Sequence, residues 1–196
     1  SQRAKMAFHK NVVDPLVLSY CSSKAAQEHG DARKALDLLR ISAEIAERDR
    51  RDFVKVKYVN KAQNVMEQDL VRNLVSTLPI QHKATLASII LNREANDKVQ
   101  QTTGEVYNTY NLICKRFKMD PLTQRRIGHI ISELDMQGLI NAKVVSLGRQ
   151  GRTKFIGMAI EKSQIDCILT DVPFLSDIVE EMRKAGYLRS MQLRLI

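Results

Sequence analysis

Residues 123–160 read TQRRIGHIISELDMQGLINAKVVSLGRQGRTKFIGMAI, and this stretch decides the fold. Its first part has apolar residues at three- and four-residue steps, as an amphipathic helix does. They are Ile127, Ile130, Ile131 and Leu134. Gly138 supplies a left-handed stop, so we expect a helix over about 123–137. From 140 to 147 and from 152 to 160 β-branched residues alternate, and Gly-Arg-Gln-Gly lies between the two runs. That pattern predicts a β-hairpin.

Two further helices are expected before this stretch. The first covers about 81–93, with inward-facing Leu86, Ile89, Ile90 and Leu91. After a polar loop over 92–101, Thr102 and Glu105 have capping-box spacing and open the second, which ends near Lys118. Three helices followed by a hairpin is the order of a winged-helix domain. In most uses of that architecture the third helix docks in the DNA major groove with the hairpin beside it.

The N-terminal third predicts consecutive helices only. Asp14 and Pro15 form a helix start, Gly30 a stop, and two further helices are expected over about 32–50 and 59–75. The fold class is therefore mainly α, with an all-helical domain at 1–76 and a winged-helix domain at 77–160. Residues 161–196 are expected to form an extension, with a turn at 171–173 and a helix near 175–184, that packs on the winged helix.

The charge of the chain is concentrated in its middle. Lys and Arg number 31 against 22 Asp and Glu, a formal net charge of +9. Residues 76–160 carry 12 basic and 6 acidic side chains, whereas residues 161–196 carry 5 and 6. A basic surplus attracts phosphate, so nucleic acid is the expected partner, although an anionic membrane surface or an acidic protein shares the sign. No apolar run is long enough for a membrane helix and no secretion signal opens the chain.

No residue set for catalysis or metal binding is found. The three cysteines and four histidines are scattered, without Cys-x-x-Cys or His-Glu-x-x-His spacing, which predicts reduced core thiols and no metal site. The eight glycines match neither the phosphate-binding loop motif of an ATPase nor the glycine-rich motif of dinucleotide-binding domains. The chain is therefore not expected to be an enzyme or to hold a cofactor by itself.

The third helix and the hairpin carry the candidate DNA-contacting residues. On the helix they are Thr123, Gln124, Arg125, Arg126, His129 and Ser132. On the hairpin they are Arg149, Gln150, Arg152 and Lys154. Arginine can bond guanine bidentately, and an arginine at a hairpin tip suits a narrow minor groove with lysine on the flanking phosphates. A glycine in the helix, Gly128, would let its backbone approach a ligand closely. Each surface alone also fits a solvated face, and it is their combination that favours DNA. An RNA-binding KH loop also has Gly-x-x-Gly, but it joins two helices.

A second informative stretch lies near the N-terminus, where residues 25–29 read AAQEH and residues 30–40 read GDARKALDLLR. An arginine in the first turn of a helix, as Arg33 is, can reach a phosphate held by a neighbouring domain. An ion pair from Arg33 to Asp37 is the simpler explanation from the residues alone.

These motifs together resemble one family. The stretch around Arg33 is similar to the second sensor region in the lid of archaeal origin-recognition/cell-division-cycle (Orc/Cdc6-type) replication initiators. QRRI at 124–127, ELDMQGLI at 133–140 and GRQGRTK at 148–154 resemble the recognition helix and wing of that family. The similarity runs from about Arg3 to Ile160.

The resemblance implies a longer parent protein with an AAA+ ATPase domain before this lid and winged helix, a view that fits a chain beginning with Ser1. The parent would recognise double-stranded origin DNA and help load the replicative helicase, using ATP or ADP with Mg held by the ATPase domain. Arg33 would then sense the nucleotide phosphate. The replicative helicase and other initiator paralogues are the implied protein partners.

The predicted function is thus the DNA-binding part of an archaeal replication initiator, monomeric without DNA and located on the nucleoid in the cytoplasm. Two alternatives stay open. A winged-helix transcription regulator would form a homodimer on a palindromic operator. A protein-interaction module of the initiator, including a negative regulator of origin use, would not need the two hairpin arginines for partner binding.

Overall fold

The computed structural model describes residues 12–27, 32–96, 100–146, 148 and 152–187. The chain divides into two compact units, residues 1–70 and 71–196. The division falls inside helix α4 (Val56–Thr77), whereas the sequence interpretation separates the domains at 76/77. The division into 1–76, 77–160 and 161–196 stays a prediction.

The first unit is built from helices α2 (Pro15–Gln27), α3 (Ala32–Arg48) and the first part of α4. Asp14 starts α2, because its carboxylate accepts a hydrogen bond from the Leu16 amide at 2.9 Å. An isolated parallel bridge pairs Val13 with Val54. The helices enclose a core that contains Val17, Leu38, Leu39, Tyr58 and Val59, each at most 4% exposed.

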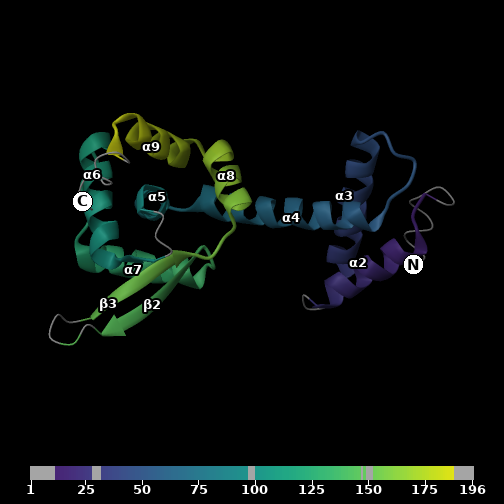
Figure 1. The fold of residues 1–196 in the computed structure, drawn as a ribbon, viewed down its shortest axis with the longest axis horizontal. Coiled ribbons are helices and arrows are strands. Elements are labelled where there is room, and N and C mark those ends of the chain that lie inside the picture. Colours follow the sequence, from purple (N-terminus) through teal and green to yellow (C-terminus); the bar gives the residue numbers. More distant parts are fainter. Residues whose placement is uncertain (1–11, 28–31, 97–99, 147, 149–151, 188–196) are drawn as a thin grey trace. The chain divides into compact units, whose positions relative to one another are not determined.

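The second unit contains the remaining elements (Figure 1). In chain order they are α5 (Ile80–Asn96), β1 (Gln101–Thr102), α6 (Thr103–Phe117), α7 (Gln124–Met136), β2 (Ile140–Ser146), β3 (Arg152–Met158), α8 (Lys162–Asp171) and α9 (Pro173–Lys184). Three helices followed by a hairpin are present in the predicted order, so the mainly α fold with a winged helix is confirmed. The predicted capping box is also present: Thr102 accepts from the Glu105 amide, and the Glu105 carboxylate accepts from the Thr102 amide at 2.6 Å.

The sheet has three strands rather than the predicted two, in the order β1-β3-β2. Gln101 pairs with Ile156 and Thr102 with Phe155, both antiparallel. The sequence predicts a polar loop at Gln101. Its side chain is instead buried, donating to the Ile89 carbonyl at 2.9 Å and accepting from the Asn92 amide at 2.8 Å. Those bonds satisfy the polar groups that burial would otherwise leave unpaired.

Helices α8 and α9 pack with the three helices of the winged helix in one core. Arg183 on α9 reaches Glu94 on α5, and Glu181 on α9 reaches Arg116 on α6. Beneath these surface pairs, the Tyr187 hydroxyl bonds Asn92 at 3.0 Å, and the Thr109 hydroxyl bonds Asn92 at 2.6 Å. Residues beyond the hairpin therefore share the hydrophobic and polar interior of the second unit.

Candidate nucleic-acid interface

Helix α7 begins at a well-formed N-cap. Thr123 has extended backbone angles, and its hydroxyl accepts from the Arg126 amide at 3.4 Å. The helix ends where Gly138 adopts φ +73°, a conformation that favours glycine. These two local signals lie in the sequence itself, and they set where α7 begins and ends.

The two faces of α7 are the predicted ones. Ile127, Ile130, Ile131 and Leu134 are at most 1% exposed. Gln124, Arg125 and His129 are exposed, as is Met136 at 80%. Within the part of the chain that the structure describes, Arg125, His129 and Gln124 have neither a hydrogen bond nor an ion pair through their side chains. Their donors face solvent and are available to a ligand.

Arg126 differs from its neighbour Arg125 because it lies 3.5 Å from the Glu133 carboxylate. The other oxygen of Glu133 is 2.6 Å from His82 Nε2 on α5. The hydrogen bond from His82, helped by the charges of His82, Arg126 and His129, lowers the pKa of Glu133 below its usual 4.5. The Arg126 side chain stays 51% exposed, so solvent weakens this pair and leaves the guanidinium within reach of a phosphate. Sequence reasoning missed the role of Glu133, since His82 lies 51 positions away.

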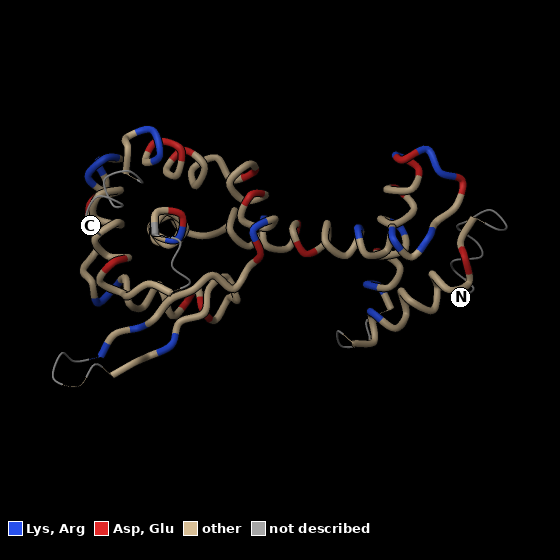
Figure 2. Tube along the Cα trace, in the orientation of Figure 1, with Lys and Arg blue, Asp and Glu red and all other residues tan. Residues whose placement is uncertain are grey.

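The hairpin of β2 and β3 is called the wing below. Its strands pair antiparallel from Ile140 opposite Met158 to Ser146 opposite Arg152, which places Arg152 at the loop end of the ladder. The two strands carry three basic residues, Lys143, Arg152 and Lys154, and no acidic one (Figure 2). Arg152 is exposed. Two predicted contact residues, Arg149 and Gln150, lie outside the described residues.

Lys154 and Ser132, predicted as separate DNA contacts, are bonded to one another. The Lys154 ammonium on β3 donates to the Ser132 hydroxyl on α7 and to the Gly128 carbonyl at 2.8 Å. The Ser132 hydroxyl also bonds the Gly128 carbonyl, at 3.2 Å. The structure therefore joins the wing to the helix through side chains from both surfaces.

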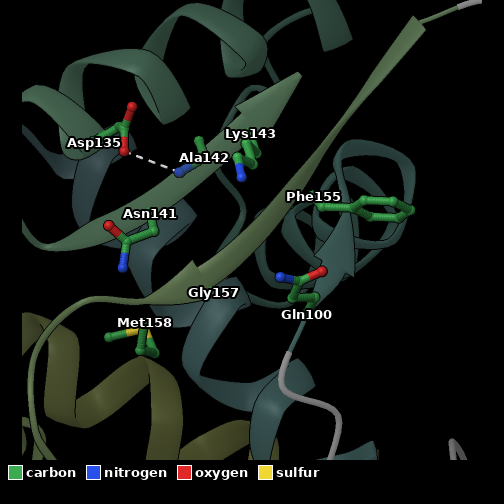
Figure 3. A pocket seen from close by; sticks show the side chains of 8 residues that line it. All are labelled: Gln100, Asp135, Asn141, Ala142, Lys143, Phe155, Gly157 and Met158. Carbon is green, nitrogen blue, oxygen red and sulfur yellow. Dashed lines mark hydrogen bonds between the residues drawn. The ribbon is translucent and has the colours of Figure 1, made fainter. Parts of the chain in front are cut away.

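The opposite face of the wing has a hollow of about 430 Å³ lined by Asn141, Lys143, Phe155 and Gly157 among others (Figure 3). Because side chains alternate along a strand, this face is turned away from Lys154 and Ile156. At its rim Asp135 accepts from the Ala142 amide at 2.9 Å and ties the end of α7 to β2. Its lining mixes acidic, amide, basic and aromatic side chains, whereas the exposed residues of α7 include Arg125, Arg126 and His129.

Arg33 lies in the first turn of α3, with an exposed side chain, in the other unit. The residues just before it, 28–31, lie outside the described part. The exposed position is compatible with the phosphate-sensing role expected from the resemblance. Among described residues, no three His, Cys, Asp or Glu side chains gather as metal ligands, and no helix is long and apolar enough to cross a bilayer.

The structure thus defines the class: a helical lid-type unit and a winged-helix unit with a basic helix and wing. Residues 1–64 match the family model of the Cdc6 AAA+ ATPase-type lid domain, and residues 73–166 match that of the CDC6 C-terminal winged-helix domain. The chain belongs to the Orc1/Cdc6 family of archaeal replication initiators.

Curated relatives agree with this assignment. The ORC1-type DNA replication protein of Pyrococcus horikoshii is 51% identical over 84% of this chain and 39% of its own length. ORC1-type DNA replication protein 1 of Archaeoglobus fulgidus is 53% identical over 78% of this chain and 37% of its own. This chain therefore spans about two fifths of the length of these relatives.

A solved structure also matches. The Aeropyrum pernix ORC1 protein in complex with DNA superposes with a TM-score of 0.76 and 39% identity, over 90% of this chain and 46% of that one. Because the match covers 90% of this chain, it includes residues of both units.

Proposed function

We propose that this chain is the double-stranded DNA-binding part of a replication initiator and that it recognises origin DNA with α7 and the wing. The observation that carries the proposal is the exposed face of α7, on which the side chains of Arg125 and His129 form no hydrogen bond or ion pair within the described part of the protein. The basic wing lies alongside it. The Aeropyrum pernix relative, solved in complex with DNA, supports the same partner.

The proposed contacts divide by chemistry. Arg125 reads a base edge in the major groove, because a guanidinium can bond guanine at two acceptors. Thr123, Gln124 and His129 lie on the same N-terminal part of α7 and add bonds to bases or backbone. Arg126 takes a phosphate, since its solvent-exposed pair with Glu133 is weak enough to be exchanged.

The wing supplies the second group of contacts. Arg149, Gln150 and Arg152 enter or flank the minor groove, where a narrow groove strengthens the negative potential. Phosphate neutralisation supplies most of the affinity. With about five basic contacts, log affinity falls against log salt with a slope of about −4 to −5. A nearly flat salt response would rule out this mechanism.

The test is quantitative binding and footprinting on an origin duplex and on a random duplex of equal length. Arg125→Ala is expected to lose about 1–3 kcal/mol of discrimination while general binding persists. Lys184→Ala, on the exposed side of α9, is the matched control for charge. If both variants lose the same amount of DNA affinity and discrimination, α7 contributes only nonspecific positive charge. Sedimentation without DNA should show a monomer, and a stable dimer on a palindrome would favour a transcription regulator instead.

The remaining proposals concern the longer protein. There, an ATPase domain would use ATP to help load the replicative helicase, alongside other initiator paralogues on the nucleoid in the cytoplasm. Arg33 would meet the nucleotide phosphate from the lid. Arg33→Ala in the full-length protein should weaken nucleotide affinity, whereas Arg40→Ala, whose side chain pairs with Glu44 at 2.9 Å, should not. Equal affinities would remove the sensor role.

A further inference from the structure

The contact between Lys154 and α7 is a closed arrangement of three groups. The ammonium donates to the Gly128 carbonyl and to the Ser132 hydroxyl, and that hydroxyl bonds the same carbonyl. The Lys154 main chain is held as well, because its amide donates to Thr103 Oγ1 at 3.3 Å on α6. Lys154 therefore connects β3 to two helices of the winged helix.

The position of Lys154 is costly for a residue that serves only as a phosphate contact. Its side chain is half-buried, and its acceptors, a carbonyl and a hydroxyl, are neutral. No carboxylate among the described residues forms an ion pair with it. A lysine on a surface gains by staying hydrated and flexible, and both are reduced when its ammonium is held against a helix.

The contact lies where the wing meets α7. Gly128 and Ser132 are one helical turn apart on α7, beside the outward face that carries Arg125 and His129. On the wing, Lys154 lies two residues from Arg152 and pairs with Val144. The contact thus lies between the wing and α7, next to the residues that we propose contact DNA.

We propose that Lys154 is a positioning residue, which holds the wing and α7 at the angle that lets both engage the same duplex. This inference rests on the proposed DNA-binding function. On this view, Lys154 and Ser132 affect sequence discrimination by fixing the position of the wing relative to α7. They do not act as independent contacts to phosphates or bases. Precise placement of both surfaces matters because contacts to bases determine sequence specificity, whereas contacts to phosphates only orient the protein on the duplex.

A double-mutant cycle tests the proposal. Lys154→Met keeps the length and the apolar stem of the side chain but cannot donate, and Ser132→Ala removes one of the two acceptors without changing charge. Lys154→Met should lose discrimination between origin and random duplex by about tenfold, as expected for a hydrogen bond to a charged group. Ser132→Ala should lose less, because the bond from Lys154 to the Gly128 carbonyl remains. The double variant should lose no more than Lys154→Met alone, because the bond that Ser132→Ala removes is already absent there.

The salt dependence gives a second readout. Ser132→Ala should keep the slope of log affinity against log salt, since no charge is removed. Lys143→Met, on the other face of the wing, is the matched control: it removes the same charge and should combine additively with Ser132→Ala. Thermal unfolding of every variant separates lost stability from lost discrimination, and binding is measured well below each midpoint.

Two results would overturn the positioning role of Lys154. Additive losses from Lys154→Met and Ser132→Ala would show independent contacts, and unchanged discrimination in both would show no role. If instead the unmodified chain shows no preference for origin DNA and Arg125→Ala changes nothing, the proposed function itself fails.

Discussion

Replacing Gly128 by Ala separates folding from DNA binding in a single substitution. Gly128 lies inside α7, and a Cβ built on it meets no atom within 4 Å beyond its two chain neighbours and the nearby backbone of its own helix. Alanine is favoured over glycine in a helix interior by about 1 kcal/mol, partly through the unfolded chain. Gly128→Ala should therefore raise the free energy of unfolding by about 0.5–1 kcal/mol, which is roughly 1–4 °C in midpoint for a chain of this length.

The same methyl group should weaken DNA binding. If duplex DNA approaches the helix backbone at this point, the added group displaces it, at a cost of about 1 kcal/mol, or roughly fivefold in affinity. Thermal unfolding and titration of an origin duplex measure the two effects. Gly104→Ala is the control, because Gly104 is also helical and its Cβ would meet only Thr102 Oγ1, at 3.9 Å. A Gly128→Ala protein that is less stable, or that binds DNA as well as the original, would refute the reasoning.

Three further predictions follow from the interior and its charges. The lowered pKa of Glu133 means that its ionised form stabilises the fold above pH 4.5 and that this contribution is lost as pH falls through the lowered value. Glu133→Gln should therefore be less stable than the original at pH 7, with the gap closing in acid-unfolding curves; a constant gap would disagree. Asn92→Ala should cost about 2–4 kcal/mol in urea unfolding, because it leaves buried partners unpaired, against about 1 kcal/mol for Tyr187→Phe; similar costs would argue against the network. Burial raises the pKa of Cys21 to about 11, so a disulfide-exchange reagent at pH 8 should modify half-buried Cys167 first; preferential reaction of Cys21 would contradict its burial.

The burial of the three cysteines agrees only in part with the prediction that all of them lie in the core. Cys21 and Cys114 are buried as expected, and Cys167 is only partly covered on α8. A scattered free cysteine gives no periodic signal of its own. Its burial depends on which face of its helix meets a neighbour, and α8 is too short for that face to stand out in the sequence.

The features that the sequence determined by itself are local. The burial of Ile127, Ile130, Ile131 and Leu134 follows from helical spacing, the start of α6 from the Thr102–Glu105 pair, and the wing from alternation on either side of a glycine-containing turn. Each needs only residues within a few positions of one another, where backbone geometry sets which side chains meet. The family resemblance also rested on such local motifs.

Only the tertiary structure decided which polar groups meet across the fold. Lys154 is hydrogen-bonded to Ser132, 22 positions away in the sequence. Glu133 is hydrogen-bonded to His82, 51 positions away, and Gln101 pairs with Ile156 in the sheet. No spacing rule links such residues, because their distance depends on how helices and strands pack around a shared core. That packing bonds two of the predicted DNA contacts, Lys154 on the wing and Ser132 on α7, to one another, while it leaves Arg125 exposed to solvent.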